Sequence, residues 1–263
     1  MKNLVVILAL ITALPVFANI NLDYQDGVYH AILDGKKSGK KIDFVSVEGL
    51  ETNKNVHNKL KSKFTINTGF FDPQNKKTIS YISSKFSGYE DPLTNENLLS
   101  NPVLNKNIQK ILNRTEFRVL ECESGFSYEI TPHSTPIKDG CFLLTSAQGG
   151  PEIYPELRLE EEFFIVKDKQ GNIIRESCSV LHKTARTIIA LKDNNIHIFI
   201  ITTKNPMTLQ EAADYVKSFG VEKAMAFDGG SSTSLNYKDI NITSTQSEGE
   251  DTGRKLKSFM IYK

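Results

Sequence analysis

The chain is dominated by short runs of apolar or alternating residues, each four to eight residues long and separated by segments rich in Gly, Asn, Asp or Pro. Runs of this length and composition are typical of strands, because core helices need longer periodic segments. The sequence therefore predicts a β-rich protein, with strands at Val28–Leu33, Lys41–Val47, Phe64–Asn67, Phe117–Cys122, Cys141–Ser146, Glu162–Lys167, Arg186–Lys192, Ile196–Thr203, Ala224–Phe227 and Leu256–Tyr262.

Two segments carry the period of a helix instead. In the first, Asn101 is the predicted N-cap, Pro102 occupies the first helical position, and apolar residues recur on one face. In the second, Thr208 and Glu211 have the spacing of a capping box, and Gly220 stands where a C-terminal cap is expected. We expect only these two prominent helices.

The second helix lies between two predicted strands, 196–203 and 224–227, and the three elements together predict a β-α-β unit. Such a unit implies at least one parallel strand pair in an otherwise antiparallel chain. The predicted fold class is α+β, with a mixed, mostly antiparallel sheet, a β-α-β unit near the C-terminus and few helices.

The N-terminus has the pattern of a secretion signal. Lys2 is followed by an apolar run from Leu4 to Leu14, and Val16-Phe17-Ala18 offers small residues for cleavage. We expect a signal peptide at 1–18, a single domain at 19–263, and a periplasmic or secreted product without a membrane span after cleavage. An uncleaved N-terminal anchor is the alternative, but the run is shorter than the roughly 20 residues that span a bilayer.

Charge and cysteine content exclude several classes of protein. The chain has 32 Lys+Arg against 31 Asp+Glu, so a broad nucleic-acid footprint is not expected. The five histidines are scattered without zinc-ligand spacing. Three cysteines allow one internal disulfide and leave one thiol, and the sequence does not choose among the three pairings.

The strongest candidate for chemistry follows the predicted strand 224–227. This apolar strand ends at Asp228, which is followed by Gly229, Gly230, Ser231 and Ser232. Ligands often bind beyond the carboxyl ends of strands, where glycines expose backbone N–H groups and hydroxyls add hydrogen bonds. The alternative is an ordinary tight turn, with Asp228 bonded to nearby backbone amides.

Three further segments join polar groups to strand ends: Asn67-Thr68-Gly69-Phe70-Phe71, Gln148-Gly149-Gly150-Pro151 and Arg186-Thr187. Together with the Thr208-Leu209-Gln210-Glu211-Ala212 helix and the Asp228–Ser232 turn, their order resembles the phosphodiester glycosidase family, which includes the uncovering enzyme that removes N-acetylglucosamine from phosphodiesters on mannose. The resemblance covers roughly residues 60–263. Thr68, Ile188 and Ser231 depart from the residues usual in the family.

The resemblance implies a hydrolase that cleaves the glycosidic bond of a sugar 1-phosphodiester, with N-acetylglucosamine as one candidate sugar. Asp228 is the expected catalytic carboxylate, and the guanidinium of Arg186 is expected to make a bidentate contact with the phosphate oxygens. Asn67 and Gln148 would hold the sugar. The remaining expected binding positions are Gly69, Gly149, Gly150, Thr187, Gly229, Gly230, Ser231, Ser232 and Arg254.

Several alternatives remain open at this point. Glycosidases generally use two carboxylates, and Asp72, Glu248 and Asp251 are candidates for the second, although each is also typical of a solvated loop. Arg186 is alternatively a structural ion-pair partner. No cofactor or metal is expected, although acids near residue 250 have the chemistry of calcium ligands. The rival functions are a non-catalytic glycan-binding protein of the cell envelope and a phosphodiesterase that cuts the P–O bond.

Overall fold

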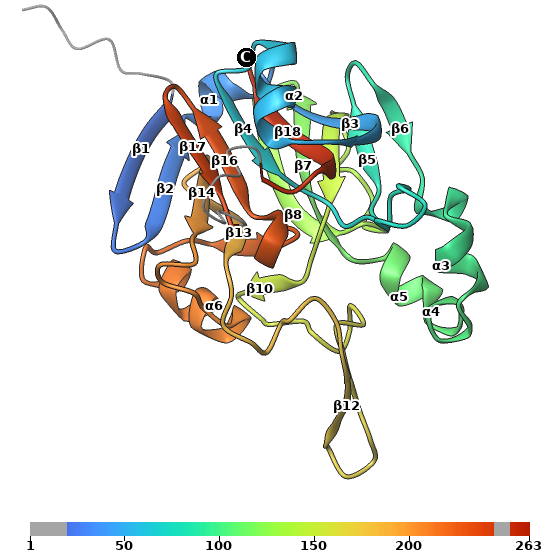
Figure 1. Cartoon of the computed structure of the whole chain (residues 1–263). Helices are drawn as coiled ribbons and strands as arrows, with labels where there is room; N and C mark the ends of the chain where they lie inside the picture. Colours follow the sequence, from blue (N-terminus) through green and yellow to red (C-terminus); the bar gives the residue numbers. More distant parts are fainter. Residues whose placement is uncertain (1–19, 245–252) are drawn as a thin grey trace, which may run out of the picture.

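The computed structural model describes residues 20–244 and 253–263, which form three sheets around a shared apolar core (Figure 1). Leu33, Phe64 and Phe117 come from different sheets, are fully buried and belong to one core cluster. The predicted signal peptide lies outside the described residues, as do Glu248 and Asp251.

The first sheet has six strands in the order β1 (Ile20–Gln25), β2 (Val28–Leu33), β14 (Asn195–Ile201), β13 (Arg186–Lys192), β15 (Lys223–Ala226) and β10 (Glu152–Tyr154). The second has five, in the order β17 (Ile240–Thr243), β16 (Ser234–Tyr237), β4 (Phe64–Asn67), β18 (Leu256–Tyr262) and β3 (Ile42–Glu51). The third also has five, in the order β6 (Gly88–Glu90), β5 (Ile82–Ser84), β9 (Cys141–Gln148), β7 (Thr115–Cys122) and β8 (Gly125–Pro132).

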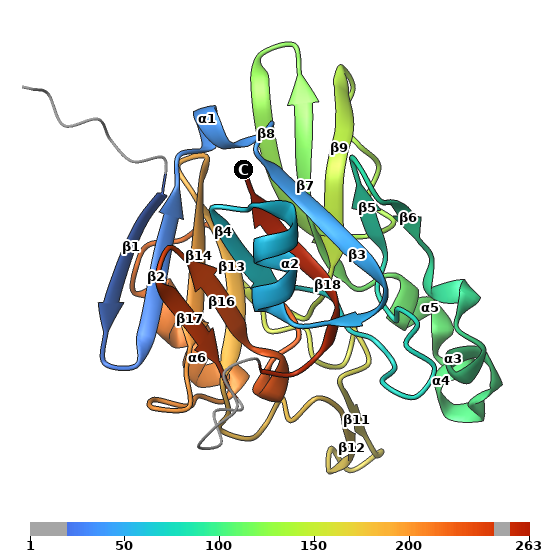
Figure 2. The same cartoon turned by 45° about the horizontal axis from the view of Figure 1, so that its top comes forward.

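A separate two-stranded hairpin, β11 (Ile165–Lys167) and β12 (Ile173–Glu176), projects away from the body (Figure 2). The helices are short: α1 (Gly35–Ser38), α2 (Asn53–Leu60), α3 (Glu96–Ser100), α4 (Pro102–Lys106), α5 (Ile108–Leu112) and α6 (Leu209–Lys217), with 3-10 turns η1 (Pro92–Thr94) and η2 (Gly230–Ser232). The α+β class with mostly antiparallel strands and few helices is confirmed.

Each predicted run contains a strand, but Glu162–Lys167 does so only from Ile165 onward. The buried carboxylate of Glu162 explains why the strand begins later than predicted. It accepts hydrogen bonds from the backbone N–H groups of Thr115 and Glu152, each at 2.9 Å, so this part of the chain turns inward to neighbouring backbone.

The predicted parallel pair is wrong. Strands β14 and β15 do flank α6 and point the same way, but β13 lies between them, and every strand pair in the described part of the chain is antiparallel. A tight hairpin causes this arrangement: Asp193 and Asn194 both have positive φ, 50° and 58°, and return the chain directly from β13 into β14.

Helix α6 forms as predicted. Thr208 and Glu211 make both hydrogen bonds of the capping box, and the buried face, including Ala212 and Val216, packs with Phe199 of the first sheet. The predicted helix after Asn101 is instead divided into α4 and α5 at Asn107, whose side chain donates to the carbonyl of Val103 at 2.9 Å.

The disulfide joins Cys122 to Cys141, which are direct partners in the register of β7 and β9. Cys178 keeps a free thiol. Within the two described ranges, no helix has both the length and the hydropathy needed to cross a membrane.

Candidate active site

Asp228 follows β15 and is fixed through its backbone to the end of β4. Its N–H donates to the carbonyl of Thr68 at 2.9 Å, and its carbonyl accepts from Nδ2 of Asn67 at 2.5 Å. Because β4 and β15 belong to different sheets, these two bonds join the sheets at the position of the carboxylate.

The carboxyl group of Asp228 has a perturbed acidity. Removal from water raises its pKa to about 6, against the opposing effects of a hydrogen bond from the Ser232 hydroxyl, the charge of Arg254 and the N–H of Gly229. Burial disfavours the charged form of a carboxyl group, whereas donors and cations favour it. A carboxyl group with this pKa is largely ionised at neutral pH and exchanges its proton easily.

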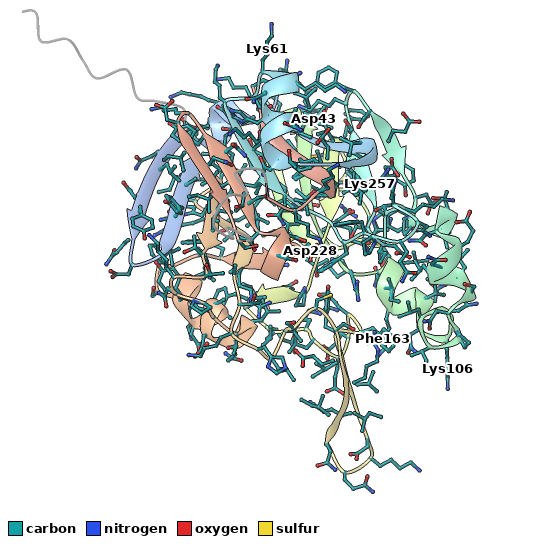
Figure 3. All side chains as sticks on the ribbon, viewed as in Figure 1. Asp43, Lys61, Lys106, Phe163, Asp228 and Lys257 are labelled. Atoms are coloured by element: carbon teal, nitrogen blue, oxygen red, sulfur yellow. A yellow bond between two sulfur atoms is a disulfide. The ribbon has the colours of Figure 1, made fainter. Side chains whose placement is uncertain are left out.

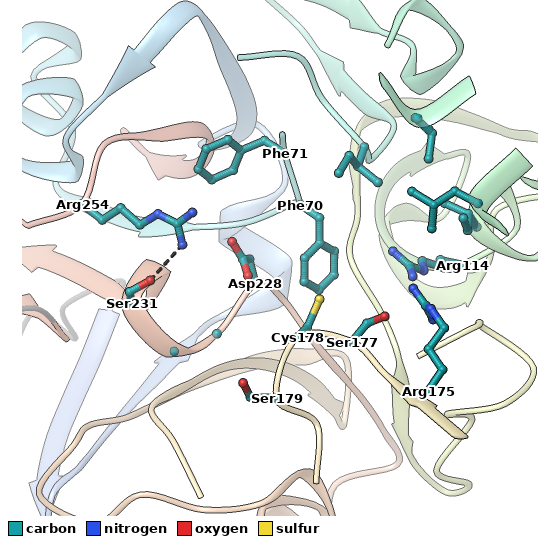
Figure 4. A pocket seen from close by; sticks show the side chains of 16 residues that line it. Phe70, Phe71, Arg114, Arg175, Ser177, Cys178, Ser179, Asp228, Ser231 and Arg254 are labelled. Carbon is teal, nitrogen blue, oxygen red and sulfur yellow. Dashed lines mark hydrogen bonds between the residues drawn. The ribbon is translucent and has the colours of Figure 1, made fainter. Parts of the chain in front are cut away.

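Asp228 lines a pocket of about 410 Å³ (Figure 4). The lining has four parts: the polar turn after β15, three arginines, an apolar wall of aromatic and aliphatic residues, and the loop at 177–179. These residues are Asp228, Gly229, Gly230 and Ser231; Arg114, Arg175 and Arg254; Phe70, Phe71, Ile79, Leu98, Leu104 and Ile111; and Ser177, Cys178 and Ser179.

Arg254 lies on one side of the carboxylate. Its Nη1 donates to the hydroxyls of Ser231 at 2.8 Å and Ser232 at 3.2 Å, and its guanidinium lies over the ring of Phe71 at 5.1 Å from the centroid. These contacts hold a cation next to Asp228. They also connect the segment that precedes β18 to the turn that follows β15. The structure therefore brings Arg254, Ser231 and Ser232 together with Asp228.

Arg114 and Arg175, which were not predicted as site residues, lie on the other side of Asp228 (Figure 4). Arg114 is 5% exposed, its Nε donates to the carbonyl of Glu162 at 3.0 Å, and its guanidinium stacks on Phe164 at 4.0 Å. Arg175 donates from Nη1 to the carbonyl of Phe163 at 3.1 Å.

The Nη groups of Arg114 make no hydrogen bond to any residue in the described ranges. A buried guanidinium with free donors that faces a pocket is suited to bind a phosphate or carboxylate. No local motif marks Arg114 or Arg175, because one precedes β7 and the other lies on the projecting hairpin.

Arg186 has a different place from the one expected for a phosphate ligand. It is 3% exposed, does not line the pocket, and donates to three backbone carbonyls, those of Met207, Ser179 and His182, at 3.0, 2.8 and 2.6 Å. Burial lowers its pKa to about 10. Through these contacts Arg186 holds the loop at 179–182 in place, and its side chain packs next to Gly229.

Asn67, Thr187 and Gln148 also lie in the framework behind the pocket. Oδ1 of Asn67 accepts from the Thr187 hydroxyl at 2.7 Å and from the Ser234 N–H at 3.0 Å. Nε2 of Gln148 donates to the carbonyls of Leu112 and Arg114. All three predicted residues are buried at 1% exposure or less, and their polar atoms have protein partners.

The predicted glycines divide between framework and lining. Gly149 is packed so tightly that a Cβ there would lie 2.7 Å from the Phe227 ring, and Gly69 and Gly150 are similarly close to Ser80 and Glu162. Gly229 and Gly230 line the pocket, and Gly230 has a φ of +57°, which favours glycine.

Asp228 is the only carboxylate lining the pocket in the described structure. Asp72 lies elsewhere, where its side chain accepts from Asn97 and from the N–H of Gln74, both at 2.8 Å. The described residues contain no cluster of three or more His, Cys, Asp and Glu side chains that could hold a metal ion.

Cys178 and Ser179 are non-glycine residues with positive φ, 59° and 50°, on the loop that Arg186 fastens. Strained backbone of this kind is common where a loop must present specific atoms to a site. Cys178 is exposed at the surface of the loop, but packing around its sulfur and the nearby Asp228 raise its pKa to about 11, so the thiol is a poor nucleophile at neutral pH.

Comparison with known proteins gives a match to the part of the chain that contains this pocket. A sequence model of the phosphodiester glycosidase family matches residues 60–262, whereas no curated protein sequence matches the chain. The zebrafish N-acetylglucosamine-1-phosphodiester alpha-N-acetylglucosaminidase catalytic domain, auto-inhibited by its pro-peptide, superposes with a TM-score of 0.60 at 12% identity, covering 92% of this chain and 81% of that one.

A hypothetical protein from Synechocystis has a TM-score of 0.56 at 13% identity, with coverage of 92% of this chain and 61% of that chain. At these identities the two structures establish similarity of fold. The family match spans more than half of the chain and includes the Asp228 turn, Arg254 and the strands that hold them. The chain belongs to the phosphodiester glycosidase family.

Proposed function

We propose that this glycosidase is a secreted enzyme that hydrolyses the C1–O bond of a sugar 1-phosphodiester and releases a free sugar and a phosphomonoester. One observation carries the proposal: a single carboxylate, Asp228, faces a pocket between Arg254 on one side and the Arg114–Arg175 pair on the other. This arrangement suits a substrate whose reacting carbon is joined to a phosphate.

The phosphate is assigned to Arg114 and Arg175, because the Nη groups of Arg114 have no hydrogen-bond partner in the described structure. Arg254 already contacts two hydroxyls through Nη1 and lies against Phe71, so it is assigned to the sugar side. The sugar then occupies the space over Asp228, bordered by Phe71 and Ser231.

In the proposed step, the bond between C1 and the phosphate oxygen breaks and its electron pair remains on the phosphate. The arginines stabilise this developing charge, so the leaving group needs little protonation. Ionised Asp228 stabilises positive charge at C1 or activates the water that supplies the new hydroxyl. The proton from water leaves through the carboxylate to solvent.

Two features support secretion. The apolar N-terminal run has the pattern of a signal peptide. Cys122 and Cys141 form a disulfide, which is typical of oxidising compartments outside the cytoplasm. N-acetylglucosamine is the first sugar to test, because the zebrafish enzyme of similar fold is named for it.

The test is a product assay on N-acetylglucosamine 1-phosphate diesters that measures free reducing sugar, sugar phosphate and phosphomonoester separately. Free sugar with an equal amount of phosphomonoester supports the proposal. Sugar phosphate as the first product assigns the chain to P–O cleavage, and saturable binding without product assigns it to glycan binding.

A further inference from the structure

A second groove lies beside the candidate active site, between helices α4 and α5 and the β11–β12 hairpin. It has a volume of about 690 Å³, and Arg175 lines both the groove and the active-site pocket. The two helices line both cavities, since Leu104 and Ile111 line the pocket whereas Lys106 and Lys110 line the groove.

The groove is strongly cationic. Lys106, Lys110, Lys167 and Arg175 line it, and Glu160 is its only lining acid in the described structure, which leaves a net charge of +3. The whole chain has a net charge of only +1, so this concentration of positive charge is local. Charge of one sign along a groove favours an oppositely charged ligand.

Two of these lysines are held in place, and one is free. Lys167 pairs with Glu160 at 2.7 Å, and Lys110 donates to the carbonyl of Glu160 at 3.1 Å. Lys106 has no side-chain partner among the described residues and points outward from α4 (Figure 3). The lining between the cations is apolar and includes Val103, Phe163 and Ile174, so it can accept the carbon skeleton of a chain.

We infer that this groove binds the leaving-group side of the substrate, and that this leaving group is a polymer of repeating phosphodiesters. The inference rests on the proposed function, which places the scissile phosphate at Arg114 and Arg175. A chain that continues past Arg175 enters the groove directly, where its next phosphates meet Lys106, Lys110 and Lys167.

The charge distribution favours a polyanion over a lipid as the occupant. A prenyl or other lipid leaving group carries one phosphate, which the arginine pair already neutralises, and it would leave Lys106 and Lys110 without counter-charges, since only Lys167 pairs with Glu160. A phosphodiester polymer supplies a negative charge in every repeat, and its polyol or sugar units lie against the apolar lining.

The test compares two substrates with the same sugar phosphate. The short substrate is the methyl diester of N-acetylglucosamine 1-phosphate, and the long one carries the same group on an oligo(glycerol phosphate). The variant Lys106→Glu reverses a charge in the groove. The matched control, Lys36→Glu, reverses an exposed lysine on α1, on the opposite side of the molecule (Figure 1).

Lys106→Glu is expected to lower kcat/KM for the long substrate about fivefold to tenfold and to leave the short substrate within about twofold, because only the long substrate reaches the groove. The same loss should diminish as salt is added, since the contacts are electrostatic. Lys36→Glu should change neither value by more than about twofold. An equal effect on both substrates, or none on the long one, overturns the inference.

A binding measurement separates this inference from the proposed function. Oligo(glycerol phosphate) is titrated by calorimetry into the parent and into Lys106→Glu, with no catalysis required. Weaker binding to the variant supports the groove even if no substrate is cleaved, whereas absence of binding to the parent overturns it. Cleavage of a sugar phosphoprenol in preference to the long polymer identifies a lipid occupant and also overturns it.

Discussion

The side chain of Asn67 holds the backbone of Asp228, through a hydrogen bond of 2.5 Å from Nδ2 to the Asp228 carbonyl. The same side chain accepts from Thr187 and Ser234, so one buried amide joins the end of β4 to the starts of β13 and β16. The position of the candidate catalytic carboxylate therefore depends on a residue that has no free polar atom for substrate.

Asn67→Ala should reduce the free energy of unfolding by about 3 kcal/mol, because it removes three hydrogen bonds and leaves buried partners unsatisfied. Urea denaturation measures this loss. Asn97→Ala, at an exposed asparagine, serves as the control and should cost less than about 1 kcal/mol. A stable Asn67→Ala protein with a raised KM alone would instead assign Asn67 to substrate binding.

Activity should rise with pH around the pKa of Asp228, which is about 6 in the free protein. The ionised carboxylate is the active form, so kcat/KM should be low below this pKa and reach a plateau above it. Ser232→Ala removes a hydrogen bond that lowers the pKa, so it should move the rising limb to higher pH. A rate that instead falls as pH increases through 6 would identify Asp228 as an acid.

Arg114 and Arg186 should respond differently to the same substitution. Arg114→Gln removes free donors that face the pocket and should lower kcat/KM at least about tenfold, with a stable fold. Arg186→Gln breaks contacts with three carbonyls and should mainly lower Tm. Kinetics and thermal melts of the two variants measure both effects. If Arg186→Gln lowers kcat/KM and Arg114→Gln mainly lowers Tm, Arg186 is the phosphate ligand instead.

Cys178→Ser should keep at least about half of the parent activity. The thiol lines the pocket, but its pKa of about 11 leaves it protonated at neutral pH, so it is not a nucleophile. Treatment with a small alkylating reagent provides a second measurement, because it should react slowly at pH 7. Complete loss of activity in the serine variant, with a normal melting temperature, would contradict this account.

The strands and the turn at Asp228 were predictable because short apolar runs and an Asp-Gly-Gly sequence are local signals. The capping box at Thr208 was predictable for the same reason. The position of β13 between β14 and β15 was missed because it depends on the left-handed residues Asp193 and Asn194, a turn that the strand pattern alone does not reveal.

The motifs identified the region of the candidate site better than the contacts within it. Asn67, Gln148 and Arg186 were expected at the substrate, but the amides of Asn67 and Gln148 and the Nε and Nη2 of Arg186 bond to backbone and buried side chains. Arg114 and Arg175 reach the pocket from a segment before β7 and from a hairpin, so only the folded chain brings them together. Family motifs thus include residues that build the pocket as well as residues that line it.

The most direct test of the account compares the mature parent protein with Asp228→Asn on an N-acetylglucosamine 1-phosphodiester, with free sugar and phosphomonoester measured together. Asparagine keeps the size of the side chain but cannot carry the negative charge. The account predicts equal amounts of both products from the parent and a loss of at least about a thousandfold in kcat for the variant, with an unchanged melting temperature. Undiminished release of free sugar by a folded Asp228→Asn variant would contradict it.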